Sequence, residues 1–372
     1  MRILIGLACA VAVFGQTQAD WVTQIKNMPV LDSRKYNFFA RTPGGTLSAG
    51  VPATVTMPAP GCPLGVAGAS TKYWAYISAG TGTAEAVLIT GGTCTSGSAT
   101  GTLQFTPTNS HSGAWTIQSA TVGINEAALA LPAGGGTVLI PAGTHQLRAP
   151  IAFKEYTTFR GMGASTKIVP ASSSAVVFDS NLTANSSSQV LTAQDGVEFS
   201  DFMIDGHSYD GINSAYGIRH VLASPASTEF SSIVGVKIQR IHFNNIRNGV
   251  YLERSADVTM RDNTSYGNTT FTFTDQNYDT AYRSYNIRSY NHKQWRRCYD
   301  ADCAIMTLSA VPIFNFENCV SCSLVSAELT DLVGGTSGPD GVRFAGACED
   351  LRIIDTTIIQ FRIGINMEGI LV

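Results

Sequence analysis

The chain has 372 residues, of which 44% are hydrophobic, so it can form a sizeable core and is not disordered as a whole. Only 14% of the residues are charged and the formal net charge is −3, which argues against a polybasic protein that binds nucleic acid or a membrane surface. Glycine is abundant, and serine, threonine and asparagine are frequent throughout. This composition is typical of an all-β secreted protein, often one built from stacked repeats.

Residues 1–19 have the pattern of a secretory signal peptide. Arg2 supplies one positive charge, an apolar run extends from Ile3 to Phe14, and Ala19 is a small residue at a suitable cleavage position. The run is too short for a bilayer, which needs about 20 residues; a buried N-terminal helix is the alternative. We therefore expect a secreted protein (extracellular, periplasmic or on the cell surface) with no membrane insertion.

The cysteines favour disulfides over a metal site. Of the eight cysteines, Cys9 lies in the expected signal peptide, so seven remain after export. Cys298-x4-Cys303 followed by Cys319-x2-Cys322 also resembles a four-thiolate zinc pattern, but the spacing is loose and the expected compartment is oxidising. An odd number leaves one cysteine free or paired between chains.

Residues 20–45 are expected to form an N-terminal linker or arm, and residues 46–122 a small β-rich module. The module is rich in Gly, Thr, Ala and Ser and contains short alternating runs at 73–78, 86–90, 101–105 and 114–117. Such runs separated by turn residues predict a small sandwich or barrel. Cys62 and Cys94 are expected to close a loop across it.

Residues 123–372 begin with a predicted short helix at 124–131 and continue as short strands. Apolar residues recur at i, i+2, i+5 and i+7, which predicts two short strands joined by a one-residue slip at a corner. The full copies are Val197/Phe199/Phe202/Ile204, Val236/Ile238/Ile241/Phe243, Cys322/Leu324/Ala327/Leu329 and Leu351/Ile353/Thr356/Ile358. Partial copies start at Val258 and Tyr285, and spacings of 22 to 39 residues between starts are typical of a solenoid.

A second type of strand begins with glycine, at Gly217, Gly249, Gly341 and Gly364. Aligning these strands puts Cys319 and Cys348 in one column, just after the strand. Stacked coils lie about 4.8 Å apart, which suits a disulfide between them. That pairing would leave Cys298–Cys303 as a loop bridge and Cys322 as a buried thiol.

The segment Thr137 to Ile168 (TVLIPAGTHQLRAPIAFKEYTTFRGMGASTKI) resembles the opening coils of the pectin-lyase-like right-handed parallel β-helix superfamily. That superfamily includes pectate lyases, polygalacturonases and phage tailspikes. Residues 202–206 (FMIDG) resemble its coil endings, and the helix at 124–131 resembles its N-terminal cap. The resemblance, over roughly residues 124–372, implies an all-β fold: a right-handed parallel β-helix with an N-terminal capping helix, here preceded by a small β-sandwich-like module.

The resemblance does not specify a reaction, because the superfamily hosts lyases, hydrolases and adhesins. The familiar polygalacturonase signatures (Asn-Thr-Asp, Asp-Asp, Gly-His-Gly and Arg-Ile-Lys) are absent from the sequence, and no Asp cluster lies near an Arg as in calcium-dependent lyases. No cofactor is expected, and Ca²⁺ is considered only for the case that the protein is a lyase. The sites must therefore be sought from geometry.

In the glycine-led strands, alternate residues such as Val250 and Leu252 are expected to point inward, so the residues between them form rows on the outer face. One row contains Arg219, Tyr251, Asn315, Arg343 and Asn366, and its neighbour contains Glu253, Glu317 and Glu368. A weaker strand at 271–275 is expected between the Glu253 and Glu317 coils, and it adds Asp275. Two coils correspond to about 9–10 Å, the upper edge of the spacing in inverting glycosidases, roughly 6.5–9.5 Å.

These rows provide the first candidate site. One acid would protonate the leaving oxygen while another activates water. The catalytic candidates are Glu253, Asp275 and Glu317, and the substrate-binding candidates are Arg219, Tyr251 and Arg343. The alternative is an ordinary solvated strand face.

Two further segments could bind a ligand. The loop from Asp205 to Gly211 brings Asp205, His207 and Asp210 together, although Asp-Gly is also ordinary turn chemistry. The segment 282–299 is basic and aromatic, and its candidates are Arg283, Trp295 and Arg296. Its aromatic rings could stack on sugars while its guanidinium groups match carboxylates or sulfates. Tyr285 and Ile287 are expected to face the core, and a basic loop that packs on its own coil is the alternative.

Together, the sequence patterns and the resemblance predict a secreted carbohydrate-active protein, either a glycoside hydrolase or a polysaccharide lyase that acts on an acidic polysaccharide. The alternative is a non-catalytic glycan-binding adhesin or tail-fibre-like surface protein, with a purely structural protein third. The sequence stops at residues 369–372, inside a coil and with no evident cap. An open apolar edge predicts a truncated sequence, or a partner or second copy that covers that end.

Overall fold

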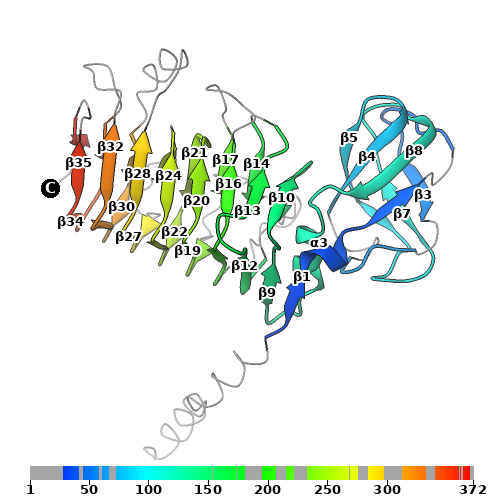
Figure 1. Ribbon diagram of the computed structural model, residues 1–372, viewed down its shortest axis with the longest axis horizontal. Helices are drawn as coiled ribbons and strands as arrows, with labels where there is room; N and C mark the ends of the chain where they lie inside the picture. The colour runs from blue at the N-terminus through cyan, green and yellow to red at the C-terminus, as the bar shows by residue number, and fades with distance from the viewer. Residues whose placement is uncertain are drawn as a thin grey trace, which may run out of the picture.

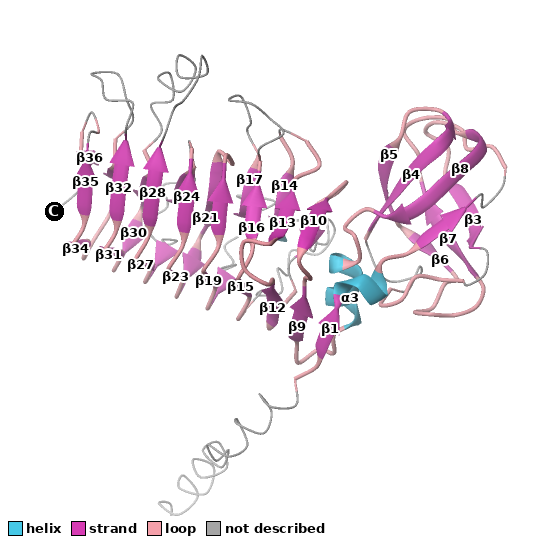
Figure 2. Cartoon of the chain, viewed as in Figure 1, coloured by secondary structure: helices cyan, strands magenta, loops and turns pink. Residues whose placement is uncertain are grey.

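The computed structural model describes residues 28–41, 45–57, 61–66, 73–152, 154–172, 174–180, 195–206, 215–221, 233–267, 269–274, 284–296, 312–331, 340–359, 361 and 363–368. Within these ranges nearly all the regular structure is strand, with one α-helix and one 3-10 helix (Figure 2). The expected signal peptide lies outside them. No helix of the described residues is long and apolar enough to cross a membrane.

Three long parallel sheets form the larger part of the molecule, and each is named here by a strand near its start. The β9 sheet consists of β1 (Val30–Asp32), β9 (Gly136–Leu139), β12 (Thr157–Arg160), β15 (Glu198–Ser200), β19 (Lys237–Gln239), β23 (Thr259–Arg261), β27 (Arg288–Tyr290), β31 (Ser323–Val325) and β34 (Arg352–Ile354). The β10 sheet consists of β10 (Gly143–Gln146), β13 (Thr166–Val169), β16 (Met203–Asp205), β20 (His242–Asn244), β24 (Thr264–Tyr266), β28 (Lys293–Arg296), β32 (Glu328–Asp331) and β35 (Thr357–Ile359).

The β11 sheet consists of β11 (Ile151–Ala152), β14 (Val176–Asp179), β17 (Tyr216–His220), β21 (Asn248–Glu253), β25 (Thr270–Thr274), β29 (Phe314–Glu317), β33 (Val342–Ala345) and β36 (Ile365–Glu368). A short fourth sheet consists of β18 (Ile233–Val234), β22 (Ser255–Ala256), β26 (Ser284–Tyr285) and β30 (Cys319–Val320). Successive strands of each sheet come from successive turns of the chain, and Figure 1 shows the coils stacked side by side. The fold is therefore a parallel β-helix, as the repeated pattern predicts.

The corner between the β9 and β10 sheets turns at one residue in the left-handed backbone region. The residues at this corner in successive coils are Asp201, Arg240, Asp262, Asn291, Ser326 and Asp355, with φ between 47° and 61°. Asp and Asn tolerate this region better than most residues, because their short polar side chains bond locally. The corner reverses which face the next residue points to, so the predicted one-residue slip is confirmed.

The interior is filled by the residues that the pattern selects. Val197, Phe199, Phe202 and Ile204 are all 0% exposed, and the second and third full copies are at most 2% exposed. Aromatic rings stack from coil to coil, as in Phe316 and Phe344, whose centroids are 5.3 Å apart. The alternation of inward and outward residues thus places apolar rows inside and polar rows outside.

The N-terminal end of the solenoid is covered by a helix. Helix α3 (Ile124–Ala130) packs Ile124, Ala127 and Ala128 into the main core, beside η1 (Ser33–Tyr36) and β1. Strand β1 pairs in parallel with β9, so part of the expected linker 20–45 adds a strand to the solenoid. Helix α3 closes a sheet edge that would otherwise be open.

The preceding module is a pair of antiparallel sheets with its own core. One sheet contains β2 (Phe39–Arg41), β8 (Ser112–Ser119), β4 (Trp74–Thr81) and β5 (Glu85–Leu88), and the other contains β3 (Ala53–Met57), β7 (Gly101–Phe105) and β6 (Gly91–Gly92). Trp115, Tyr73 and Phe105 are buried between them. The predicted Cys62–Cys94 disulfide is present.

A second disulfide corrects the predicted Cys319–Cys348 bridge. Cys319 is bonded to Cys322, and Cys348 keeps a buried thiol. The predicted column is right, because Cys348 Sγ lies 3.4 Å from the backbone nitrogen of Cys319. However, the chain turns at Ser321 with φ of 56° and brings Cys322 back into the same interior space. The predicted loop bridge Cys298–Cys303 lies outside the described residues.

The last described coil exposes apolar side chains. Ile354, Ile359, Ile365 and Met367 are 44% to 63% exposed, whereas the equivalent residues of earlier coils contact a following coil. A partner or second copy at this end stays a prediction.

Candidate functional site

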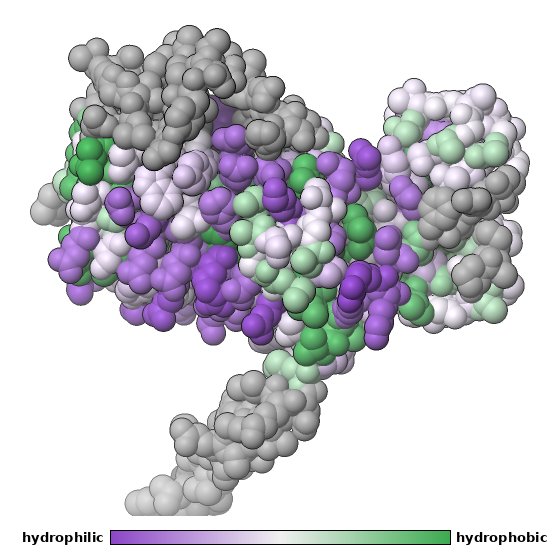
Figure 3. Space-filling model, in the orientation of Figure 1, coloured by the Kyte–Doolittle hydropathy of each residue, from purple (hydrophilic) through white to green (hydrophobic). Residues whose placement is uncertain are grey.

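A hollow on the outer face of the β9 sheet combines cationic and aromatic side chains. Its volume is about 730 Å³. It is lined by Tyr285, Asn286, Arg288, Tyr290, Val320, Ser321, Cys322, Ser323, Val325, Asp350, Arg352 and Ile354. We call it the β31 groove, because β31 forms its floor. Figure 3 shows hydrophilic side chains along the side of the solenoid where Figure 1 places β19, β27 and β34.

The groove exists because of the order in which large and small residues are stacked. The register pairs Arg288 with Ser323 and Ser323 with Arg352, so a serine lies between two arginines. The next outward row places Val325 between Tyr290 and Ile354. The outward side chains of β31 are thus shorter than those of β27 and β34 on either side. These two strands lie two rungs, about 9–10 Å, apart.

The two arginines differ in their partners. Arg352 donates from Nε to Asp350 at 3.0 Å, and Asp350 also accepts from Ser321 Oγ at 3.0 Å. Hydrogen bonds from Ser321 and Arg352 hold the pKa of Asp350 below its usual value, so this carboxylate stays ionised. Arg288 makes no ion pair with another described residue. The groove therefore retains an uncompensated positive charge.

Two tyrosines provide aromatic surface at the edge of the groove. Tyr285 is 43% exposed, and the guanidinium of Arg261 lies 5.6 Å from the centroid of the Tyr290 ring. The expectation that Tyr285 faces the core is wrong, whereas Ile287 is buried as expected. Ser284 takes the inward position of β26, and strand alternation then directs Tyr285 outward.

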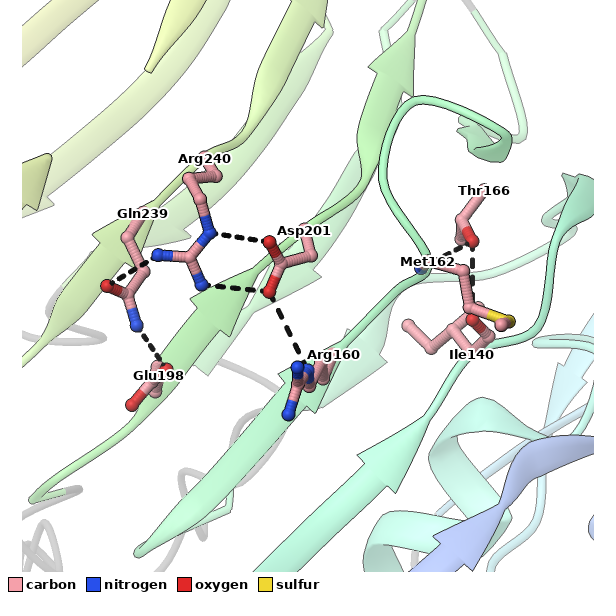
Figure 4. Close-up of polar contacts among 8 residues, drawn as sticks. All are labelled: Ile140, Arg160, Met162, Thr166, Glu198, Asp201, Gln239 and Arg240. Carbon is pink, nitrogen blue, oxygen red and sulfur yellow. Dashed lines mark hydrogen bonds and ion pairs between the residues drawn. The ribbon is translucent and has the colours of Figure 1, made fainter. Parts of the chain in front are cut away.

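Nearer the N-terminal end of this side, Arg160 and Arg240 share one acidic partner. Asp201 accepts from Nε of Arg240 at 2.6 Å and lies 3.6 Å from Arg160, which links three coils (Figure 4). The hydrogen bond from Arg240 is the main cause of a lowered pKa of Asp201. Gln239 joins the same network by donating to Glu198. This cluster stabilises the corner. Both of its arginines have an acidic partner, whereas Arg288 has none among the described residues.

The rows of the β11 sheet lie as the sequence predicts. Strand β25 pairs with both β21 and β29, so it separates the Glu253 coil from the Glu317 coil. The register pairs Glu253 with Thr274, so Thr274, not Asp275, takes the position next to Glu253 in this row. Glu253 is only 5% exposed and accepts from the Tyr251 hydroxyl at 3.2 Å, whereas Glu317 is half-buried.

The basic candidates on this face are held by acidic partners. Arg219 donates to Asp179 and lies over the ring of Tyr216. Arg343 donates from Nη2 to Glu368 at 2.8 Å and from Nη1 to Asn315 at 3.3 Å. These contacts order the face but reduce the charge it can offer to a ligand.

The other candidates lie on the β10 sheet or outside the described residues. Asp205 accepts from Asn244 at 2.9 Å, and Trp295 lies on the outer face of β28. For Arg296 only the backbone is described. Four candidates lie outside the described residues, namely His207, Asp210, Asp275 and Arg283.

Arg288 and Tyr290 lie in the segment 282–299, but the sequence alone does not distinguish them from the other basic and aromatic residues there. Asp350 and Arg352 lie in the following coil and had no local signal. Only the register between coils brings these residues together. In the described part of the chain, no three His, Cys, Asp or Glu side chains are grouped to hold a metal ion.

No protein-family model and no curated protein matches the sequence. Among solved structures, ORF18 of Geobacillus virus E2 matches with 12% identity and a TM-score of 0.34, over 68% of this chain and 58% of that chain. The present chain therefore spans less than two thirds of that protein.

Two other solved structures are similar at the same level. DFA-IIIase from Arthrobacter chlorophenolicus A6, in complex with GF2, matches with 12% identity and a TM-score of 0.38, over 61% of this chain and 70% of that chain. The Streptococcus pneumoniae surface protein and adhesin PfbA matches with 10% identity and a TM-score of 0.28, over 67% of this chain and 95% of that chain. The fold assignment rests on the strand pairing itself.

Proposed function

We propose that the protein is exported and binds an acidic polysaccharide in the β31 groove. The observation that supports this most directly is the pair of arginines, Arg288 and Arg352, on either side of a hollow with a low floor. The disulfide Cys62–Cys94 supports export, since disulfides persist in oxidising compartments.

The chemistry of the groove suits a uronate or sulfated sugar. A guanidinium group donates two parallel hydrogen bonds to a carboxylate or sulfate, and such charge-assisted bonds are stronger than neutral ones. Tyr285 and Tyr290 offer ring faces to the apolar side of a sugar and hydroxyls to its polar edge. Ser321 and Ser323 can exchange hydrogen bonds with sugar hydroxyls.

The double variant Arg288→Ala/Arg352→Ala tests this proposal. We expect its affinity for polygalacturonate or heparin to fall about tenfold or more, because charge-assisted hydrogen bonds contribute about 1.5–3 kcal/mol each. Affinity electrophoresis and calorimetry at two salt concentrations would measure it, with weaker binding expected at the higher one. Lys35→Ala removes an exposed charge far from the groove and is the control.

Three outcomes would contradict the groove assignment. Wild-type protein that binds no acidic polysaccharide refutes the proposal, and so does full affinity in the double variant. An equal loss in Lys35→Ala would point to a non-specific charge effect. Far-UV circular dichroism of each variant checks that the solenoid is intact.

The β11 sheet supports a second candidate function, hydrolysis of a glycosidic bond. The supporting observation is the register that puts Glu253 and Glu317 in one outward row two rungs apart, near the upper edge of inverting carboxylate spacing. Half-buried Glu317 would act as the base and Glu253, largely shielded from water, as the acid.

If this second function holds, Glu253→Gln and Glu317→Gln should each lower turnover at least 100-fold, the scale of general acid–base catalysis. Release of reducing sugar from a panel of polysaccharides would measure it, with Glu155→Gln as the control. Unchanged turnover in both variants, or no turnover by the wild type on a broad panel, excludes hydrolysis at this face.

A further inference from the structure

The outer face of the β10 sheet carries a continuous polar and aromatic row. The register aligns Asp205 with Asn244, Asn244 with Tyr266, and Tyr266 with Trp295. Figure 1 shows their strands β16, β20, β24 and β28 side by side. Three rungs correspond to roughly 14 Å, the length of a short oligosaccharide rather than of one sugar. We call these four residues the Trp295 row.

The row points away from the core. The residue before each member faces inward and is 0% exposed, namely Ile204, Phe243, Ser265 and Gln294. Strand alternation therefore directs the four row residues outward. Asn244, Tyr266 and Trp295 are each partly exposed, so their surfaces can be reached from solvent.

Two aromatic rings form one end of the row. The centroids of Tyr266 and Trp295 are 5.6 Å apart with an interplanar angle of 43°. His242 lies 5.9 Å from the Tyr266 ring and extends the aromatic surface. Burial lowers the pKa of His242, which therefore stays uncharged at neutral pH. Lys293, two residues before Trp295 on β28, lies 3.8 Å from Glu328.

The other end of the row accepts and donates hydrogen bonds. Asn244 Nδ2 donates to Asp205 Oδ1 at 2.9 Å, and this bond fixes the orientation of the amide. Asp205 is 9% exposed and Asn244 is partly exposed, so the amide oxygen of Asn244 is the group placed to accept from sugar hydroxyls. The carboxylate of Asp205 repels an anionic sugar. This face thus differs in charge from the β31 groove, where Arg288 attracts anions.

We propose that the Trp295 row is a second sugar-binding site that takes an uncharged oligosaccharide. Tyr266 and Trp295 would lie against the apolar faces of sugar rings, and Asn244, oriented by Asp205, would bond the hydroxyls of the next sugar residue. The site lies around the corner at Asn291 from the β31 groove. It does not depend on the groove being occupied, so the two sites can be tested separately.

The experiment titrates the full chain with neutral glucose- and xylose-based oligosaccharides and follows tryptophan fluorescence. Trp295 and Trp74 are both partly exposed, whereas Trp115 is 0% exposed, so a signal change that is lost in Trp295→Phe reports a contact at the row. We expect Tyr266→Ala and Trp295→Ala to weaken binding about tenfold each, the scale of one aromatic contact. Calorimetry supplies the affinity where the fluorophore has been removed.

Matched variants separate this site from general effects. Tyr156→Ala removes a 47% exposed ring elsewhere on the solenoid and should leave neutral-sugar binding unchanged. Trp295→Phe keeps an aromatic face and should retain part of the affinity. Arg288→Ala/Arg352→Ala should keep neutral-sugar binding, and Trp295→Ala should keep binding to polygalacturonate.

The proposal is overturned if no neutral oligosaccharide binds, or if Trp295→Ala binds as well as the wild type. An equal loss in Tyr156→Ala also overturns it. If the arginine variant loses neutral sugars, the protein has one shared site and the second site is refuted. Loss of polygalacturonate binding alone, in the arginine variant, leaves the Trp295 row supported.

Discussion

Glu126→Gln is expected to stabilise the protein by about 3 kcal/mol at pH 8 and to leave its stability near pH 4 almost unchanged. Glu126 lies in α3, is 0% exposed, and contacts the module through Thr121, whose hydroxyl donates to Glu126 Oε2 at 2.9 Å. Burial raises the pKa of Glu126 from 4.5 to about 7, while hydrogen bonds from Ser119 and Thr121 oppose the shift. Tyr73, also buried, has its own pKa raised by burial and by the Glu126 charge.

The sign follows from proton counts. Between pH 4.5 and about 7 the folded chain keeps a proton on Glu126 that the unfolded chain releases, so stability falls as pH rises through this window and is level above it. His220 and His292 act in the opposite direction, because burial lowers their pKa values to about 4 and about 3. Their contribution is complete above pH 6.5 and is lost as pH falls.

Urea unfolding at several pH values between 4 and 8 measures both effects. In Glu126→Gln the histidines remain and the opposing carboxyl is gone, so stability should rise with pH more steeply than in the wild type between pH 4.5 and about 7. Glu155→Gln changes a partly exposed carboxyl and should follow the wild type. Parallel pH profiles for wild type and Glu126→Gln would show that Glu126 is ionised in the folded protein at neutral pH.

The core of the solenoid could be predicted from sequence because its code is local. The spacing i, i+2, i+5 and i+7 depends only on strand alternation and a one-residue corner. It therefore predicts Val236, Ile238, Ile241 and Phe243 as core residues without any information about the neighbouring coils. The rows on the β11 sheet followed from the same alternation. Each of these predictions uses one coil at a time.

The β31 groove could not be predicted in that way, because it depends on which coils are stacked. Ser323 indicates a groove only when it is known to lie between Arg288 and Arg352. That register cannot be derived from the sequence, because the loop lengths between coils vary. The predicted Cys319–Cys348 disulfide is wrong for a related reason. The two cysteines do lie in one column, but a turn within one coil brings Cys322 closer to Cys319. The pattern predicts Tyr285 to point inward, and this is wrong because the copy that starts there is only partial.

Phe271→Ala should cost about 3–5 kcal/mol of folding stability, the usual range for deleting a fully buried phenylalanine. Phe271 is 0% exposed and lies between coils. Its ring centroid is 5.0 Å from that of Phe314, 5.4 Å from that of Phe243 and 4.6 Å from that of His292. Removal leaves a cavity that these rings cannot close without moving the backbone of two coils.

Because each coil contacts only its neighbours, the loss should be felt most at the boundary between the coils of β21 and β29. Urea unfolding of Phe271→Ala should therefore show a lower midpoint and a broader transition, as the two halves become less coupled. Phe271→Leu should cost much less, because it keeps most of the volume. Tyr156→Ala, at an exposed ring, should stay within about 0.5 kcal/mol of the wild type. A loss below about 1 kcal/mol for Phe271→Ala would mean that the aromatic stack contributes little, and that the coils are held mainly by their backbone ladders.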